Sequence, residues 1–525
     1  MTIRVLDCTL RDGGYCNHWN FGKNNIAKII KYLLDTKIDI VECGFLTNSV
    51  CYNSNCTKFT DINQFKQFLP NDKKGKLFVA LMNYGEYDLD NLPNYDGTSI
   101  DGIRLAFHKN NYESALRQCN LIKQKGYKVF VQGMVSLSYT DDEFISLIRA
   151  VNALSPYAFY IVDSFGQMKK KDLLRLLYLV ENNLDNHICI GFHSHNNMQL
   201  AYSNAQCIVD FHSHKNIIID SSVYGMGRGA GNLNTELFVE YLNENLNANY
   251  DTRPLLSMID EILNIFYEEN SWGYSLQNYL SAKHNLHPNY ASYLDSKKTL
   301  TIEDIDKIFS NFVEDKKINY DKNYIEKLYF DYMENNKIDS GSESIFVNSL
   351  KNKEILVLGP SKEISKNLNV ILKFIKEKNP IVISLNFKHN IINSDYIFVS
   401  NKRRFKEISK EDYCKCVCSS NISAKDVYLK LSYKSLTNDS ESVTDNSCLM
   451  VIKFLINSNI KKVNIVGVDG YSSDFEDNFI DNSMNFYASK NTFITLNKGM
   501  NKVLTEYSKK IDIKFLVPPK FLILP

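Results

Sequence analysis

Short, almost continuously apolar runs alternate with longer amphipathic stretches over the first 225 residues. Eight runs are rich in β-branched residues and bounded by turn residues, as buried parallel strands are: 3–8, 39–45, 76–82, 102–107, 127–135, 159–165, 188–195 and 216–225. The stretches between them, such as 24–36, 113–126 and 142–154, carry apolar residues at helical spacing. Eight strand–helix units predict an α/β fold of the (β/α)8 TIM-barrel type, with an open doubly wound sheet as the competing arrangement.

Helical spacing dominates residues 228–345, and strand–helix alternation resumes after them. We therefore expect a TIM barrel at 1–245, a helical extension with a linker at 246–345, and a Rossmann-like α/β domain at 346–525. The polar stretch 335–344 is the expected linker. The third part lacks a GxGxxG turn, so no dinucleotide is predicted there. Its role stays open between a scaffold and a small-ligand site near Ser361 or Asp469.

Composition and charge limit the partners of the chain. Its 525 residues have a formal net charge of +1, which gives no electrostatic footprint for nucleic acid or an anionic membrane. Twelve cysteines are scattered without a disulfide framework, as is usual for reduced thiols. No apolar run has membrane-spanning length, and no leader precedes the first strand. We expect a soluble cytoplasmic protein that binds neither nucleic acid nor membrane; a homo-oligomer is compatible with the sequence.

Polar side chains gather where the expected strands end. In a TIM barrel, the loops that carry chemistry follow the C-terminal ends of the strands. Those ends carry Arg11 and Asp12, Glu42, Arg104 with His108, Gln132, Asp163 and Ser164, His193 with His195, and Ser221 with Ser222. Because unpaired buried charges are costly, we expect these side chains to face a shared cavity.

Two of these strand ends predict a divalent metal site. His193 and His195 lie on the same side of a strand, and Asp12 follows the first strand, which neighbours the eighth in a closed barrel. Three such ligands leave positions open for a substrate. The alternative is a loop of hydrogen-bonded histidines. Arg11 can stabilise an enolate oxygen or a substrate carboxylate, or can orient Asp12.

Five ordered motifs carry a resemblance to a known family. TLRDGGY, DIVECGF, VDSFG, GFHSHNNMQLAYSNA and DSSVYGMGRGAGN, within roughly residues 1–300, resemble the DRE-TIM metallolyase (HMG-CoA-lyase-like) superfamily, and most closely its 4-hydroxy-2-oxovalerate aldolase branch. The resemblance implies that Asp12, His193 and His195 bind Mn²⁺ or Mg²⁺. It adds Asn232 as a ligand, directly or through water. It also implies that Arg11 stabilises the enolate of a 2-oxo acid, which reacts with an aldehyde.

The residue for proton transfer departs from this pattern. The aldolase branch has a catalytic histidine where this chain has Tyr15, and an unperturbed phenol is a poor base near neutral pH. Tyr15, the nearby His18 or a metal-bound water are the alternatives. In the aldolases a tyrosine of the helical extension reaches the site, and Tyr274 matches it. The same aromatic stretch, 272–294, otherwise reads as a helix packed on the barrel mouth, with His284 and His287 as weaker candidates for the opening.

The remaining candidates concern the substrate. Arg104 and Ser164 are expected substrate contacts, and Glu42 and Asp163 either bind a substrate hydroxyl or pair with Arg11 or Arg104. The leading prediction is a metal-dependent aldolase acting on a 2-oxo acid such as pyruvate and an aldehyde, for which a sugar is one option. A Claisen-type acyl-CoA lyase or synthase is the alternative enzyme, although the catalytic cysteine of the lyases is missing from GMGRGAGN. A non-catalytic barrel scaffold is the third alternative.

Overall fold

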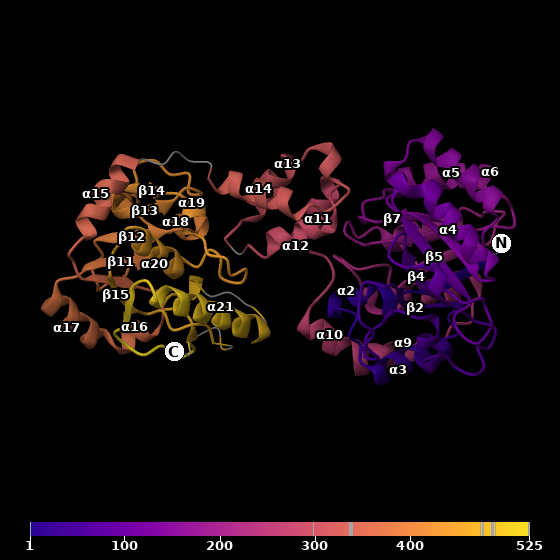
Figure 1. The fold of residues 1–525 in the computed structure, drawn as a ribbon, viewed down its shortest axis with the longest axis horizontal. Helices are drawn as coiled ribbons and strands as arrows, with labels where there is room; N and C mark the ends of the chain where they lie inside the picture. Colours follow the sequence, from indigo (N-terminus) through magenta and orange to yellow (C-terminus); the bar gives the residue numbers. More distant parts are fainter. Residues whose placement is uncertain are drawn as a thin grey trace. The chain divides into compact units, whose positions relative to one another are not determined.

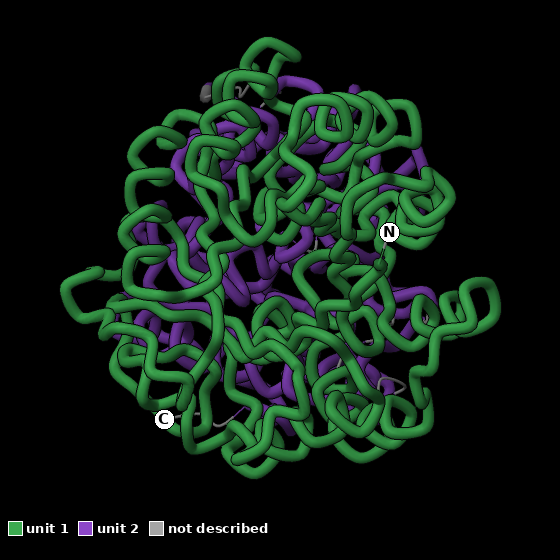
Figure 2. The backbone as a smooth tube through the Cα atoms, turned by 90° about the vertical axis from the view of Figure 1, so that its right-hand side faces the viewer, with its two compact units in different colours: residues 1–292, 313–320 green, residues 293–312, 321–525 purple. Residues whose placement is uncertain are grey.

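The chain folds into two compact units. The computed structural model describes residues 2–297, 299–334, 340–472, 474, 477–484, 488 and 490–522. One unit comprises residues 1–292 and 313–320, and the other comprises 293–312 and 321–525 (Figure 2). The three-part division expected from the sequence stays a prediction. Of the expected linker, 335–339 lies outside the described residues, and 340–344 belongs to helix α15 (Ser340–Leu350).

The first unit is built on a closed parallel barrel (Figure 1). Strand β1 (Ile3–Asp7) pairs with both β2 (Ile40–Leu46) and β9 (Ile217–Ser221), which closes the ring. The other barrel strands are β4 (Leu77–Asn83), β5 (Gly102–Phe107), β6 (Lys128–Gly133), β7 (Ala158–Asp163) and β8 (Cys189–Ser194). A two-residue strand, β3 (Lys58–Phe59), extends from β2. The predicted TIM barrel is confirmed.

Helices cover most of the strand crossovers. They are α3 (Lys23–Asp35), α4 (Tyr112–Gln124), α5 (Asp141–Leu154), α6 (Lys170–Asn183) and α7 (Ala201–Asp210), with α8 (Thr235–Leu246) after the last strand. The crossovers on either side of β4 carry 3₁₀ turns in place of an α-helix, η1 (Ile62–Gln67) and η2 (Leu89–Asn91). Both segments contain proline and clustered Asn and Asp residues, which favour turns over a continuous α-helix.

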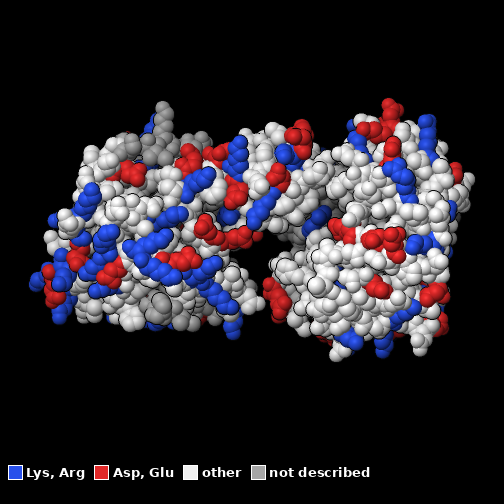
Figure 3. Space-filling view, in the orientation of Figure 1, with Lys and Arg blue, Asp and Glu red and all other residues white. Residues whose placement is uncertain are grey.

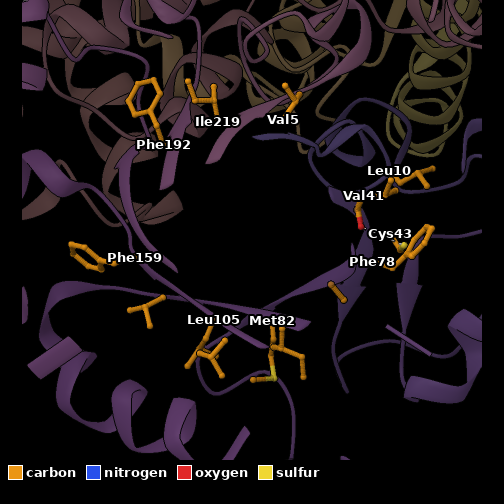
Figure 4. Packing of buried hydrophobic residues seen from close by; sticks show 14 of the residues in the cluster. Val5, Leu10, Val41, Cys43, Phe78, Met82, Leu105, Phe159, Phe192 and Ile219 are labelled. Atoms are coloured by element: carbon orange, nitrogen blue, oxygen red, sulfur yellow. Dashed lines mark hydrogen bonds between the residues drawn. The ribbon is translucent and has the colours of Figure 1, made fainter. Parts of the chain in front are cut away.

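Alternation along the strands places polar groups inside the barrel. Outward residues such as Val5, Leu105, Phe159 and Phe192 lie around the ring of strands and pack in the core beneath the helices (Figure 4). Successive side chains point to opposite faces, so a residue two positions after an inward one also points inward. The inward apolar side chains of Ile40, Phe130 and Ile218 are each followed by a buried polar residue. These residues are Glu42, Gln132 and Asp220.

The helical extension continues from the barrel. Its elements are α9 (Arg253–Met258), the π-helical turn η6 (Ile259–Leu263), α10 (Asn264–Glu269), α11 (Leu276–Lys283) and α12 (Pro288–Asp295). Hydrogen bonds fix it to the barrel: Trp272 Nε1 donates to Tyr224 O at 2.8 Å, Asn270 Nδ2 donates to Cys16 O at 2.8 Å, and Glu261 accepts from the hydroxyl of Tyr32 at 2.8 Å. Residues 313–320, which include the turn η7 (Glu314–Lys316), return to this unit.

The second unit contains a seven-stranded parallel sheet in the order β14-β13-β12-β11-β10-β15-β16. Its strands are β10 (Ile355–Leu358), β11 (Ile381–Leu385), β12 (Tyr396–Val399), β13 (Cys416–Ser419), β14 (Leu429–Leu431), β15 (Lys462–Val466) and β16 (Asp512–Phe515). The helices of this unit include α13 (Ile302–Ser310), α14 (Lys322–Met333), α17 (Leu368–Lys378), α20 (Ser447–Asn457) and α21 (Lys490–Ser508). This is the expected Rossmann-like fold.

Basic and acidic side chains are interspersed over both units on the face in Figure 3, in keeping with the net charge of +1.

Among the described residues, no helix combines the length and apolar character that crossing a lipid bilayer requires.

Candidate metal centre and active site

The C-terminal ends of the barrel strands surround a cavity of about 280 Å³. Nine of the residues named from the sequence line it: Arg11, Asp12, Tyr15, His108, Gln132, Ser164, His193, His195 and His287. Apolar side chains form another part of the wall, among them Phe45, Leu81, Val162 and Phe165. The barrel mouth therefore brings charged groups and an apolar surface together in one chamber.

The predicted metal ligands converge in this cavity. Asp12, His193 and His195 are buried, and each offers one ligand atom within 4.8 Å of the others. Asp12 Oδ2 lies 3.7 Å from His193 Nε2 and 3.8 Å from His195 Nδ1. His195 Nδ1 has no hydrogen-bond partner among the described residues. A buried polar atom left unpaired costs about 1–3 kcal/mol. The donor set fits a divalent cation, which would take up this nitrogen and the carboxylate.

A tight turn after β1 places Arg11 and Asp12. They belong to the short helix α1 (Thr9–Asp12), whose residues are all buried. Asp7 accepts a hydrogen bond from Thr9 N at 3.0 Å, and Thr9 Oγ1 accepts one from Val223 N at 2.9 Å. These bonds tie the start of the helix to the end of β9, so the two charged side chains enter the cavity instead of solvent.

A glycine-rich loop brings Asn232 to the same carboxylate. Gly231 has φ +78°, and a Cβ there would lie 2.0 Å from Gly225 O, so the loop accepts only glycine at this point. Asn232 Nδ2 donates to Asp12 Oδ2 at 2.7 Å, while Asn232 Oδ1 is buried without a partner in the described chain. That oxygen is a further candidate ligand, so the role predicted for Asn232 remains open to test.

Burial and the neighbouring charges determine the protonation states of the metal-ligating groups Asp12 and His195. Burial by itself would raise the pKa of Asp12, but the charges of Arg11, His195 and His193 outweigh burial and hold this pKa well below its usual range. Burial lowers the pKa of His195 to about 3. Asp12 is therefore a carboxylate and His195 a neutral imidazole near neutral pH, the forms in which these residues bind metals.

A chain of buried charges runs beneath the cavity. Arg11 Nε donates to Glu42 Oε2 at 2.7 Å, and Arg11 Nη1 donates to Asp12 Oδ1 at 2.7 Å. Glu42 Oε1 lies 2.8 Å from Arg104 Nη1, and Arg104 Nη2 donates to Asp220 Oδ2. The pairs thus continue from Asp12 through Arg11, Glu42 and Arg104 to Asp220.

Asp220, the last residue in this series of ion pairs, contacts the predicted metal ligand His193. Its Oδ2 lies 2.9 Å from His193 Nδ1. Because a carboxylate is only an acceptor, Nδ1 must carry a proton, and in the neutral form of the ring Nε2, which faces Asp12, has the lone pair. A carboxylate behind a histidine in this way orients the ring and raises its basicity as a ligand. Sequence reasoning missed Asp220, although its spacing of two from the inward Ile218 marks it as an interior residue.

The structure places the other predicted residues in different surroundings. Tyr15 is 38 % exposed at the cavity, and its ring centroid lies 5.3 Å from the guanidinium carbon of Arg228. His18 is exposed, Tyr274 is 56 % exposed, and the lining of the cavity includes neither. The catalytic roles of His18 and Tyr274 therefore stay predictions, because neither residue lines the cavity.

The expected substrate contacts divide in the same way. Ser164 lines the cavity, and its Oγ accepts a hydrogen bond from Val135 N at 2.9 Å. Glu42 and Arg104 are fully buried and pair with each other, which is one of the two roles predicted for Glu42. Asp163 accepts hydrogen bonds from Gln167 N and Met168 N at 3.0 Å each, and burial raises its pKa to about 7. Asp163 therefore holds the loop that follows β7 and does not itself line the cavity.

Three more cavity residues come from other segments. Arg228 lies within the glycine-rich loop, between Gly227 and Gly229, and was missed by sequence reasoning. His108, which was expected to face the cavity, follows β5, and His287, a weaker candidate for the opening, comes from the helical extension just before α12. His284, its expected companion, is absent from the lining. A (β/α)8 pattern flags His108 as a strand-end residue, but the position of His287 depends on how the extension packs.

Comparisons with known proteins match this barrel. Residues 104–262 match the HMGL-like family model. A 4-hydroxy-2-oxovalerate aldolase from Geobacillus genomosp. 3 is 25% identical over 245 residues, covering 46% of this chain and 70% of the relative. An oxaloacetate decarboxylase from Mycobacterium tuberculosis is 25% identical over 243 residues, covering 45% of this chain and 69% of the relative. The N-terminal domain of an aldolase candidate from Bacteroides vulgatus aligns with 27% identity and a TM-score of 0.47, covering 56% of this chain and 96% of that domain.

The HMGL-like match and the aldolase-named relatives support the class predicted from the sequence, a carbon–carbon lyase. Within that class, the resemblance to the DRE-TIM metallolyase superfamily is confirmed, and the aldolase-named relatives confirm its 4-hydroxy-2-oxovalerate aldolase branch.

Proposed function

We propose that the barrel is a divalent-metal-dependent aldolase that cleaves or forms a carbon–carbon bond between a 2-oxo acid and an aldehyde. The observation that carries this proposal is the buried Asp12, His193 and His195 donor set, which lies beside Arg11 in one cavity. The aldolase names of the relatives support the same reaction. Pyruvate is the proposed acid and Mn²⁺ or Mg²⁺ the proposed ion. The proposed compartment is the cytoplasm, where free cysteines such as those of this chain are stable.

The ion and Arg11 have complementary roles in the proposed reaction. A divalent cation held by Asp12, His193 and His195 would supply Lewis acidity toward the oxygens of the 2-oxo acid. Glu42 and Asp12 occupy two of the five N–H donors of Arg11 and fix its orientation. The guanidinium can then stabilise the negative charge that develops on the enolate oxygen when the carbon–carbon bond breaks. Glu42 is thereby a positioning residue for Arg11.

The walls of the cavity suit a small acid and a hydroxylated aldehyde. The apolar side chains of Phe45 and Leu81 would exclude water from the reacting carbons, which strengthens the electrostatic contacts there. Asn83, Glu86 and Asn111 also line the cavity and offer hydrogen-bonding groups. A hydroxylated aldehyde, such as a sugar, is therefore the proposed partner of the 2-oxo acid.

Oxaloacetate decarboxylation is a second candidate, supported by one relative and by Tyr15. Loss of carbon dioxide from oxaloacetate produces the same pyruvate enolate as aldol cleavage, but no hydroxyl proton has to be removed. Tyr15 stands where the aldolase branch is expected to have its catalytic histidine, and a chain without that base could still carry out the decarboxylation. The relative from Mycobacterium tuberculosis bears this activity in its name.

Exchange of the pyruvate methyl protons tests the proposed enolate chemistry. Proton NMR in deuterated water would follow the wild type with Mn²⁺, after chelation, and in His193→Ala. The control is His187→Ala, because His187 is an exposed histidine on the segment that leads into the same strand. We expect metal-dependent exchange in the wild type and the control, and its loss in His193→Ala. A wild type that binds Mn²⁺ without any exchange would refute the proposed function.

The two candidate activities are separated by their products. Aldol cleavage of 4-hydroxy-2-oxovalerate releases acetaldehyde, whereas oxaloacetate releases carbon dioxide. The wild type with Mn²⁺ should release acetaldehyde if the aldolase proposal holds. Carbon dioxide release without any aldehyde release from 4-hydroxy-2-oxo acids of increasing length would favour the decarboxylase instead.

A further inference from the structure

We propose that His287 is the catalytic hydrogen-bond donor to the oxygen of the aldehyde in this reaction. The proposal rests on the proposed aldolase function and assigns a residue that the five barrel motifs do not contain. Its basis is the place of His287 in the cavity and the hydrogen bond that fixes the tautomer of its ring.

The helical extension delivers His287 into the cavity of the metal ligands. His287 and the proposed ligands Asp12, His193 and His195 line the same chamber. The backbone N–H of His287 donates to Lys317 O at 2.9 Å, which ties it to the returning segment 313–320. The proposed donor therefore comes from outside the barrel strands and still lines the cavity at their C-terminal ends.

Aromatic packing holds the ring of His287. Its centroid lies 5.8 Å from that of Phe165, which follows β7, and 5.9 Å from that of Tyr320. The neighbouring Tyr290 is itself fixed, because its hydroxyl lies 2.9 Å from both Lys316 O and Asn319 O and its one proton is shared between these two acceptors. A ring packed on several sides loses little further freedom when a substrate binds, as positioning of a reacting group requires.

A hydrogen bond from the first turn of α12 determines which nitrogen of the His287 ring carries the proton. Asn289 N donates to His287 Nδ1 at 3.2 Å, so Nδ1 carries the lone pair and the neutral ring carries its proton on Nε2. Burial lowers the pKa of His287 to about 3, with the charges of Arg228 and His108 acting in the same direction. The ring therefore remains neutral near neutral pH and presents an N–H donor, the form in which a histidine polarises a carbonyl without transferring a full proton.

The proposed step balances without a proton taken up by His287. In cleavage, the hydroxyl proton of the 4-hydroxy-2-oxo acid leaves to water, and the bond between C3 and C4 breaks. Its electron pair moves into the enolate of the 2-oxo acid while the oxygen on C4 becomes the aldehyde carbonyl. Nε2–H donates a hydrogen bond to that oxygen while it carries negative charge. In the addition direction, the same bond polarises the aldehyde toward attack.

Tyr15 is the competing donor, and the two residues differ in a testable way. A donor to the aldehyde oxygen acts only when the carbon–carbon bond changes, whereas a base for enolisation acts on pyruvate alone. The experiment therefore measures three quantities on the full chain with Mn²⁺: the affinity for Mn²⁺, exchange of the pyruvate methyl protons, and cleavage of 4-hydroxy-2-oxovalerate. The variants are His287→Phe, His287→Gln and Tyr15→Phe, with His284→Ala as a control on the same extension.

We expect His287→Phe to keep Mn²⁺ affinity and methyl exchange within about 2-fold and to lose cleavage by about 100-fold, the typical effect of removing one such donor. His287→Gln keeps an N–H donor and should recover part of the rate. The proposal is overturned if His287→Phe keeps full cleavage, if exchange and cleavage fall together, or if Tyr15→Phe alone loses cleavage.

Failure of the proposed function itself gives different results. A wild type without exchange refutes the enolate chemistry altogether. A wild type that exchanges pyruvate protons but cleaves no 4-hydroxy-2-oxo acid overturns the aldolase reaction and the role of His287 with it. A lower thermal midpoint of His287→Phe with intact exchange and lost cleavage still supports the donor role, because exchange reports a folded metal site.

Discussion

Asp220→Asn tests whether the carboxylate behind His193 sets the affinity of the metal site. Asp220 Oδ2 contacts both His193 Nδ1 and Arg104 Nη2, so the oxygen of an asparagine can keep both hydrogen bonds while the negative charge is lost. Loss of such a partner typically lowers metal affinity by about 10–100-fold. That range corresponds to about 1.4–2.7 kcal/mol.

Glu42→Gln is the matched control. Glu42 is the other carboxylate that pairs with Arg104, is equally buried, and contacts Arg11 instead of a histidine. Removing either charge weakens the pairing of a fully buried guanidinium, so both variants should lower the free energy of unfolding. Only Asp220→Asn should weaken Mn²⁺ binding by tenfold or more.

Isothermal titration of Mn²⁺ into the purified variants measures the difference, and thermal unfolding without metal checks that both remain folded. The reasoning would be refuted by an Asp220→Asn variant that binds Mn²⁺ as tightly as the wild type. It would also be refuted if Glu42→Gln lost as much affinity, since the effect would then come from the buried charge cluster and not from the contact to His193.

Three further changes test the barrel around the site. Burial raises the pKa of Asp7 to about 6, so the folded state holds a proton that the unfolded chain releases near pH 4, and stability falls as the pH rises through this window. In Asp7→Asn, the decrease in the free energy of unfolding between about pH 4 and pH 8 should be about 3 kcal/mol smaller than in the wild type, as measured by urea unfolding at the two pH values. Gly231→Ala should cost about 1–3 kcal/mol and weaken Mn²⁺ binding, because its Cβ would meet Gly225 O; a wild-type thermal midpoint would contradict this. Trp272→Phe should cost about 1 kcal/mol through the lost bond to Tyr224 O, read from the thermal midpoint, and an unchanged midpoint would contradict it.

The sequence predicted the parts of the site that depend on strand position. Arg11, Asp12, His193 and His195 each follow or end an apolar run, and in a TIM barrel that position is enough to place them at one end of the ring. The three predicted metal ligands, Asp12, His193 and His195, offer atoms within 4.8 Å of one another because the barrel closes between β9 and β1. The pattern of apolar runs, the polar residues at their ends and the spacing of the two histidines carried this information.

The parts that the sequence left open or missed depend on distances across the barrel and on the extension. The pairing of Glu42 with Arg104 was predicted only as one of two alternatives, because β2 and β5 are not neighbours and the pairing depends on the radius of the ring. Asp220 was hidden because it continues an isoleucine run that reads as strand. His287 was predicted only as a weaker candidate, because its place at the cavity depends on contacts of the extension with residues 313–320, which no local pattern encodes.

The buried charges also bear on which acid the site would accept. Asp12, Glu42 and Asp220 contribute three negative charges, and Arg11 and Arg104 contribute two positive ones, so the cluster beneath the cavity carries an excess of one negative charge. Carboxylate substrates would be repelled by that excess, and the repulsion is strong where water is excluded. A divalent cation in the proposed site would change the balance to one positive charge. The loaded cluster would then be neutralised by one carboxylate, which favours a 2-oxo monoacid such as pyruvate over a dianion such as oxaloacetate.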